Sequence, residues 1–130
     1  MCLYINNLEP KIADKDIICY KLVERTKIKG VYKSEFRGFE YIIRQLYTNY
    51  FDIKFSYFLI KHTLRVHQRI NFIEEGMFHS YTSNSYPTLK TSSYYVLLKC
   101  IIPKGAYYFK GYFGNHPSYA SSQIKILEEL

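Results

Sequence analysis

The sequence contains no tryptophan and, in 130 residues, only six glycines, four prolines and three cysteines. The low glycine and proline content and the absence of any repeat exclude collagen-like, low-complexity and repeat architectures. The cysteines, Cys2, Cys19 and Cys100, are widely spaced and form no C-x-x-C pair, which argues against a disulfide framework or a structural zinc site. Because Cys19 and Cys100 lie within apolar runs, we expect both to be reduced, buried and inert.

Long hydrophobic runs are also missing. The first apolar stretch ends at Asn6, and no run approaches the roughly 18 residues that span a bilayer. We therefore expect no secretory leader, no membrane contact and a cytoplasmic location. With 48% hydrophobic and 22% charged residues, the chain can bury a core, which predicts a single domain over residues 1–130.

Acidic residues are absent from most of the C-terminal part. No Asp or Glu lies between Glu75 and Glu128, whereas lysines occur there at positions 90, 99, 104, 110 and 125. Two-carboxylate mechanisms are therefore excluded from this segment, and the acids that precede it show no ligand spacing. We expect no metal and no cofactor. The chain as a whole has 18 basic and 11 acidic residues, a net charge of +7, which favours an anionic partner.

Tyrosine is abundant, with 15 residues. Abundant Ile, Lys and Phe together with rare Ala are typical of a coding sequence rich in A and T, so base composition accounts for part of this content. It does not account for position. Eight tyrosines fall in the last fifty residues, at 81, 86, 94, 95, 107, 108, 112 and 119.

The pattern of β-branched and aromatic residues predicts a mainly β to α+β fold, with an antiparallel sheet and a C-terminal β-hairpin. Residues 1–15 are polar and are interpreted as a lead-in arm. A helix over 38–47 is an alternative to strands there, and 56–72 is either a short amphipathic helix or, as we favour, a strand pair. We predict strands over 16–23, 31–33, 39–43, 46–47, 51–55, 77–81, 94–102, 106–109 and 123–127.

Two turns stand out among the connections between these strands. Gly30 follows a run of charged residues and predicts a hairpin between 16–23 and 31–33. The sequence Pro103-Lys104-Gly105 is typical of a tight turn, and it predicts that 94–102 and 106–109 pair as the C-terminal hairpin.

The candidate catalytic side chains lie in the short segment Phe78-His79-Ser80-Tyr81. None of the four histidines has metal-ligand spacing, but on this short strand a base, a hydroxyl and a phenol project together. Alternation along the strand places His79 and Tyr81 on one face and Ser80 on the other. His79 and Ser80 are therefore candidate catalytic residues, and no triad can be assigned from order alone.

The lysines and tyrosines support a second interpretation, the binding of an anionic partner. Lysines attract phosphates, and exposed tyrosines stack on bases at about 1–3 kcal/mol each. No nucleic-acid-binding motif occurs, so nucleic acid is permitted rather than indicated. The alternative is that half of these tyrosines alternate into the core. The predicted ligand-binding residues are Tyr20, Lys21, His79, Tyr81, Lys104, Tyr107 and Tyr119.

Five phrases of the sequence are distinctive: Met1-Cys2-Leu3-Tyr4, residues 16–21, Phe78-His79-Ser80-Tyr81, residues 99–108 and Tyr119-Ala120-Ser121-Ser122. In these phrases the chain resembles a small uncharacterised family of gut Bacteroidetes and their phages. The resemblance covers most of the chain and carries no assigned activity. It implies a phage or mobile-element accessory protein in the host cytoplasm.

The chain contains, in order, an early strand with Tyr20 and Lys21, a short strand with His79-Ser80-Tyr81, a strand that ends in the Pro-x-Gly turn at 103–105, and a late strand that begins at Ser122-Gln123-Ile124. In this order it resembles, more distantly, the ADP-ribosyltransferase-type fold. The resemblance implies a nicotinamide-cofactor contact at Tyr20 or Lys21, a serine motif at His79-Ser80-Tyr81 and the late functional position at Gln123. The fold carries glutamate where this sequence has Gln123, and an amide cannot stabilise developing positive charge as a carboxylate does.

Three hypotheses follow. The first is a non-catalytic accessory protein that binds a nucleotide-like ligand or an acidic host-protein surface, with inhibition of host defence as its role. The second is an ADP-ribosyltransferase-like enzyme that uses Tyr20, His79, Ser80 and Gln123. The third is a structural or virion-associated protein.

Overall fold

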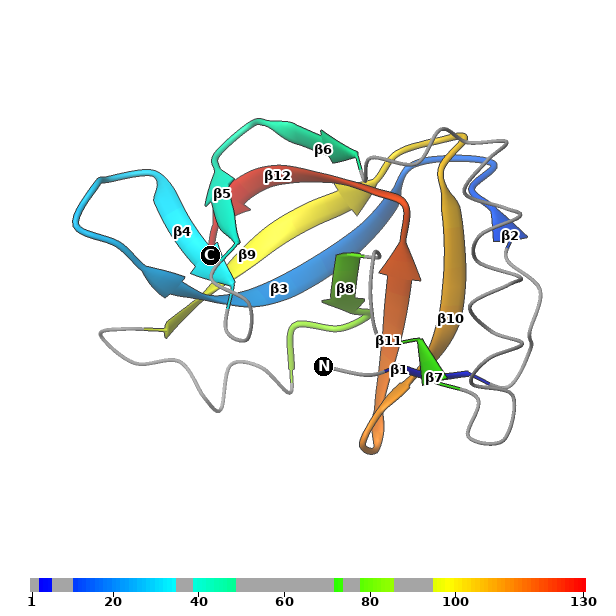
Figure 1. Cartoon of the computed structure of the whole chain (residues 1–130). Helices are drawn as coiled ribbons and strands as arrows, with labels where there is room; N and C mark the ends of the chain where they lie inside the picture. Colours follow the sequence, from blue (N-terminus) through cyan, green and yellow to red (C-terminus); the bar gives the residue numbers. More distant parts are fainter. Residues whose placement is uncertain (1–2, 6–10, 35–38, 49–71, 74–77, 86–94) are drawn as a thin grey trace.

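The β-branched and aromatic segments form one antiparallel sheet (Figure 1). The computed structural model describes residues 3–5, 11–34, 39–48, 72–73, 78–85 and 95–130. In these ranges no helix occurs, so the mainly β prediction is confirmed, and no helix is long and apolar enough to cross a membrane. The strands are β1 (Leu3–Ile5), β2 (Lys11–Ile12), β3 (Ile17–Arg25), β4 (Val31–Ser34), β5 (Glu40–Ile42), β6 (Leu46–Thr48), β7 (Phe72–Ile73), β8 (Phe78–Tyr81), β9 (Tyr95–Ile102), β10 (Tyr107–Phe113), β11 (His116–Ser121) and β12 (Gln123–Glu129).

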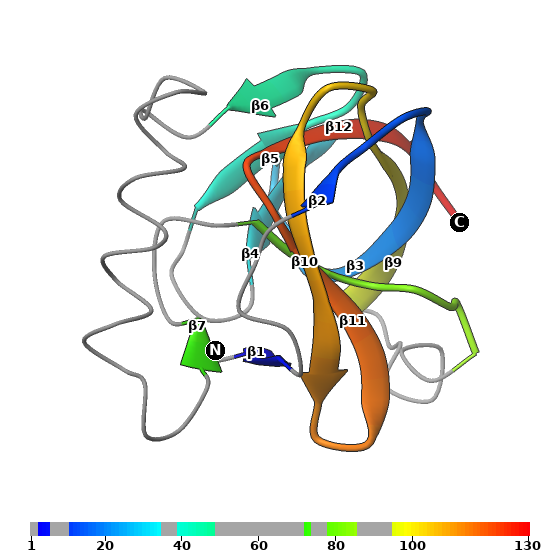
Figure 2. The same ribbon diagram turned by 90° about the vertical axis from the view of Figure 1, so that its right-hand side faces the viewer.

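The sheet consists of two halves that meet between β3 and β8. The path of hydrogen-bonded neighbours is β6-β12-β9-β3-β8-β11-β10-β1-β7, with β4 and β5 attached to β3 and with β2 attached to β10. We call β3, β4, β5, β6, β9 and β12 the first half, and β1, β2, β7, β8, β10 and β11 the second half. In Figure 1 the β10–β11 hairpin runs across the direction of β3 and β9. Strands of the two halves therefore run in different directions. Figure 2 views the molecule from the side of the β10–β11 hairpin, with β3 and β9 behind it.

Two chain segments turn side by side from one half into the other. The link from β2 to β3 contains Ala13, and the link from β9 to β10 contains Gly105. The Gly105 amide donates to the Ala13 carbonyl oxygen at 2.8 Å, and the Ala13 amide donates to the Ala106 carbonyl oxygen at 2.9 Å. Gly105 has a φ of 91°, which glycine adopts without steric cost. The two links thus form one hydrogen-bonded corner.

This corner corrects the predicted C-terminal hairpin. Both strands and the turn at Pro103-Lys104-Gly105 are present, but the prediction that 94–102 and 106–109 pair with each other is wrong. Strand β9 pairs with β3 and β12, whereas β10 pairs with β1, β2 and β11. Both edges of each strand are therefore occupied by other partners, and the turn carries the chain between the halves instead of folding it back.

The C-terminal hairpin that does form joins β10 and β11. Its loop is Gly114-Asn115, because Phe113 is paired with His116, and Gly114 has a φ of 61°. A two-residue loop with a glycine at positive φ is a favoured hairpin connection. Strand β11 was not predicted from the sequence. Its Pro117, which has no N–H, made the segment unlike a paired strand.

The structure also bears on the other strands and turns that the sequence predicts. The strands near 16–23, 31–33, 77–81 and 123–127 and the turn at Gly30 are confirmed, Gly30 with a φ of 82°. The alternative of a helix over 38–47 is wrong, because β5, a turn and β6 occupy 39–48. The interpretation of 51–55 lies outside the described residues, and so does that of 56–72 except for Phe72, which lies in β7. Within 1–15, the expected lead-in arm, β1 and β2 pair with β10.

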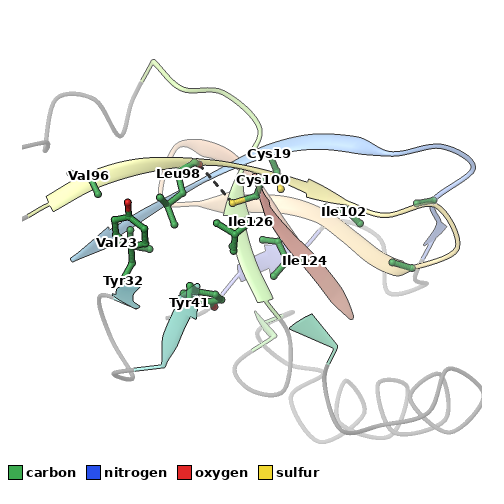
Figure 3. Close-up of a cluster of buried hydrophobic side chains, with 12 residues drawn as sticks. Cys19, Val23, Tyr32, Tyr41, Val96, Leu98, Cys100, Ile102, Ile124 and Ile126 are labelled. Carbon is green, nitrogen blue, oxygen red and sulfur yellow. Dashed lines mark hydrogen bonds between the residues drawn. The ribbon is translucent and has the colours of Figure 1, made fainter. Parts of the chain in front are cut away.

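The core lies on the face that alternate residues of β3, β9 and β12 share. Val23, Leu98 and Ile126 are fully buried there, and Tyr32 and Tyr41 cover the cluster from β4 and β5 (Figure 3). Burying a side chain of this size is worth about 1.5–3 kcal/mol. This cluster therefore holds the first half together, and the corner residues Ala13 and Ala106 extend it towards the second half.

Candidate functional site

The acidic residues of the strands are confined to the first half of the sheet. Glu24 lies in β3, Glu40 in β5, and Glu128 and Glu129 in β12. The described strands of the second half contain no Asp or Glu. The acid-free interval of the sequence is therefore divided in space. Lys99 of β9 and Lys125 of β12 lie in the same half as these glutamates. Lys110 of β10 lies in the second half, whose described strands carry no carboxylate.

Strand β10 presents two different faces. Phe109 is 1% exposed and Gly111 is buried on one face, whereas Lys110 and Tyr112 are exposed on the other, Tyr112 to 41%. Tyr108, on the same face as Lys110, is half-buried. Because side chains alternate along a strand, the sequence of β10 itself places tyrosine, lysine and tyrosine in a line along one face.

Neighbouring strands extend this line into a surface. Lys11 of β2 lies directly opposite Tyr108, and Tyr119 of β11 lies directly opposite Lys110. Partners in an antiparallel pair project from the same face, so Lys11 and Tyr119 join that face. The Tyr108 and Tyr119 rings touch edge to face with centroids 5.8 Å apart. We call Lys11, Tyr108, Lys110, Tyr112 and Tyr119 the Lys–Tyr face.

The Lys–Tyr face is open at one end and buried at the other. Across the sheet Lys110 is paired with Tyr119, and Tyr119 is paired with Ser80 of β8. Lys110 is exposed, Tyr119 is half-buried and Ser80 is 3% exposed. Burial, followed by Tyr108 and Cys19, raises the pKa of Tyr119 above the ordinary value of 10.0.

Lys21 is buried at the seam between the two halves. Its side chain projects from the core face of β3 and is 8% exposed. Lys21 Nζ donates a hydrogen bond to the backbone carbonyl oxygen of His79 in β8, and it lies 5.2 Å from the centroid of the Tyr41 ring. A cation over an aromatic face is favourable, and more so when it is desolvated. These contacts support a structural role in joining the halves for Lys21, which the sequence placed among the ligand-binding residues.

Cys19 and Cys100 lie directly opposite each other on β3 and β9, and both are free and buried. Burial raises the pKa of Cys19 to about 11, although the Ser80 hydroxyl and the Lys21 charge act in the opposite direction. Burial raises the pKa of the Cys100 thiol further. A thiol is a nucleophile only as the thiolate. The geometry therefore agrees with the expectation that these residues act as small hydrophobic side chains.

The other predicted residues of β3 and β8 lie on the opposite face of the sheet. Tyr20 is paired with Tyr81, and His79 shares their face by alternation, whereas Ser80 faces Cys19. Tyr81 is 7% exposed and Tyr20 is half-buried. The structure thus brings Tyr20, His79 and Tyr81 together, but on the face that turns away from the Lys–Tyr face.

Lys104, Tyr107 and Gln123 lie near the corners. Lys104 is exposed in the turn after β9, and its backbone amide, not its ammonium, donates to Asp16 Oδ1 at 2.9 Å. The half-buried Tyr107 exchanges hydrogen bonds with Ser122 through its backbone amide and carbonyl groups. These contacts position the backbone and do not gather the three side chains around one centre.

Gln123 lies at one end of β8 and Tyr20 at the other. The Ser121 hydroxyl contacts the carbonyl oxygens of Phe78 and Gln123, at 3.4 and 2.9 Å, whereas Tyr20 pairs with Tyr81. Phe78 and Tyr81, at the two ends of β8, are three residues apart, which corresponds to about 10 Å along a strand. The first and second positions that the ADP-ribosyltransferase resemblance implies are therefore adjacent, through the Tyr20–Tyr81 pairing and the hydrogen bond from Lys21 to the His79 carbonyl oxygen. The third, Gln123, lies beyond the Phe78 end of β8.

Of the five residues of the Lys–Tyr face, only Tyr119 was among the predicted ligand-binding residues. The other four were not predicted. A signal for three of them was present, because Tyr108, Lys110 and Tyr112 alternate along one predicted strand and its continuation. No local signal could indicate Lys11, which reaches the face through the pairing of β2 with β10.

No group of three or more His, Cys, Asp or Glu side chains in the described ranges is arranged to hold a metal ion. Comparisons of the chain with models of protein families, with curated proteins and with solved structures found no match. The site is therefore interpreted from its own geometry.

Proposed function

We propose that this chain is a non-catalytic binding protein that holds an anionic partner against the Lys–Tyr face. The observation that carries the proposal is the position of Lys11 and Lys110, both exposed and diagonal to each other across β2 and β10, in a half-sheet whose described strands hold no carboxylate. Carboxylates on the same strands would neutralise such lysines; the acids nearest in the chain, Asp14 and Asp16, lie in the link after β2 and not on a strand of this face. The strands themselves therefore favour a positive potential that attracts anions.

The surroundings of the lysines favour binding over catalysis. The thiols nearest to the buried end of the face, Cys19 and Cys100, have pKa values raised by burial and are protonated at neutral pH. The tyrosines beside the lysines offer phenol hydroxyls and ring faces. A partner on this face would thus meet cations and hydrogen-bond donors rather than a nucleophile and its base.

Inorganic polyphosphate provides a direct test, because it carries closely spaced negative charge and no other functional group. The test compares the double variant Lys11→Glu/Lys110→Glu with the double variant Lys27→Glu/Lys29→Glu. Lys27 and Lys29 are exposed in the turn between β3 and β4, so both variants change the net charge by the same amount.

We expect the Lys11/Lys110 variant to bind polyphosphate weaker by roughly tenfold or more, and to show a smaller dependence of affinity on salt. The Lys27/Lys29 variant should keep most of the affinity. Equal losses in the two variants would show that only net charge matters and would contradict the proposal. All four lysines are exposed, so unfolding curves should confirm that both variants fold.

A further inference from the structure

We infer that the anionic partner of the Lys–Tyr face is a single-stranded nucleic acid, whose phosphates contact Lys11 and Lys110 and one of whose bases stacks on the exposed ring of Tyr112. Tyr108 and Tyr119 are half-buried and pack against the core beneath this face. This inference rests on the proposed function and specifies its partner. It depends on two features of the face: the spacing of its side chains and the exposure of the Tyr112 ring.

The spacing matches an extended chain of alternating charges and rings. Alternate residues of a strand are about 6.8 Å apart, so Tyr108, Lys110 and Tyr112 follow one another at that interval along β10. Lys11 and Lys110 occupy diagonal positions of an antiparallel pair, about 7–8 Å apart. A polymer that runs along β10 would therefore meet a ring, a cation and a ring in turn, with a second cation beside the first ring.

Exposure of the rings favours a base over a simple anion. Tyr112 is 41% exposed and lies opposite the exposed Pro117, so one large ring is available at the open end. Tyr108 and Tyr119 hold each other in edge-to-face contact, and such mutual packing reduces the rotamer freedom that a ligand would otherwise have to restrict. Base stacking on aromatic side chains is tolerant of sequence because every base has a π-face.

Two other polymers fit this face less well. An acidic polypeptide could pair its carboxylates with Lys11 and Lys110, but a carboxylate has no aromatic face that could stack on the exposed Tyr112 ring. A duplex would also satisfy the lysines, but its bases are already stacked on one another, and sequence-specific proteins reach unstacked bases in single strands. The combination of cations with an exposed ring therefore favours a single strand.

The experiment measures the affinity of the full chain for four probes at low salt: an oligothymidylate, the same length of duplex DNA, inorganic polyphosphate and poly-glutamate. Each is titrated against the unchanged protein and against Tyr112→Ala and Tyr112→Phe. Phe39→Ala serves as the matched control, because Phe39 is 45% exposed and lies directly before β5, outside the Lys–Tyr face. Its ring contacts Tyr41 and Tyr47, so an unfolding curve should confirm that this variant folds.

We expect the oligothymidylate to bind more tightly than any other probe. Tyr112→Ala should weaken its binding by roughly 5- to 150-fold, the range that corresponds to the loss of one stacked base, whereas Tyr112→Phe should retain it. Neither variant should alter polyphosphate binding, and Phe39→Ala should leave every affinity within about twofold.

Different failures lead to different conclusions. If polyphosphate binds and Tyr112→Ala has no effect on the oligothymidylate, the nucleic-acid inference is overturned and the proposed function stands. Tighter binding of duplex DNA or of poly-glutamate would overturn the inference in favour of that partner. If no probe binds at low salt, the inference and the proposed function fail together.

Discussion

Raising the pH from 8 to 10 should destabilise the folded chain through its two buried thiols. An ordinary thiol has a pKa of 9.0, and burial raises the pKa of Cys19 to about 11. At pH 10 the unfolded chain therefore releases the Cys19 proton, whereas the folded chain retains it. Because the unfolded state then binds fewer protons, the free energy of unfolding falls as the pH rises above 9.

The expected loss can be worked out from these values. At pH 10 the solution is one unit above the ordinary thiol pKa of 9.0, and one unit corresponds to about 1.4 kcal/mol. The pKa of Cys100 is raised further by the same cause, so it contributes a similar amount. Together the two thiols should lower the free energy of unfolding by about 3 kcal/mol between pH 8 and pH 10.

The assay is denaturant unfolding at pH 8, 9 and 10, with Cys19→Ala/Cys100→Ala as the reference. The reference should be less stable at pH 7, because it leaves small cavities, but it should lose this pH-dependent decrease. Cys2 is present in both proteins, so its contribution cancels. Burial also raises the pKa values of Tyr32 and Tyr119, but both tyrosines are present in the two proteins, so their contributions cancel as well. A free energy of unfolding that is constant or rises from pH 8 to pH 10 would refute the assignment of these thiols to the core.

Two further predictions test the assignment of the faces and the hairpin. Phe109→Ala should lower the free energy of unfolding by about 3–5 kcal/mol because Phe109 is 1% exposed, whereas Tyr112→Ala should change it by about 0.5 kcal/mol, since Tyr112 is 41% exposed. Similar losses in denaturant unfolding for the two variants would mean that the faces of β10 are assigned wrongly. Gly114→Ala should cost about 1–2 kcal/mol, since its φ of 61° disfavours a side chain although space is open around it. An unchanged midpoint of unfolding would contradict the proposed loop.

Local properties of the fold could be predicted from the sequence, because the residues that decide them are neighbours in the chain. The β-branched and aromatic run at 16–23 and the turn at Gly30 led correctly to β3 and its hairpin with β4. Pairing between distant segments was different. Pro103-Lys104-Gly105 has the same turn chemistry in a corner as in a hairpin, and only the partners of β9 and β10 distinguish the two.

Part of the candidate site could likewise be predicted from the sequence. The dipeptide Gly114-Asn115 is a hairpin signal, and with it the alternation of Tyr108, Lys110 and Tyr112 would have indicated a face with lysine and tyrosine. The contribution of Lys11 depends on long-range pairing and could not be predicted. The tyrosines that were predicted to bind a ligand in the C-terminal part differ in burial: Tyr81 is buried, whereas Tyr107 and Tyr119 are half-buried.

The most direct test of the central claim is to map where polyphosphate binds by titrating the isotope-labelled full chain and following its backbone amide signals. Binding to the Lys–Tyr face predicts the largest shifts at Lys11, Lys110, Tyr112 and Tyr119, saturating with one affinity. The largest shifts at Tyr20 and its neighbours on the opposite face, or small shifts spread over all exposed lysines, would contradict the claim.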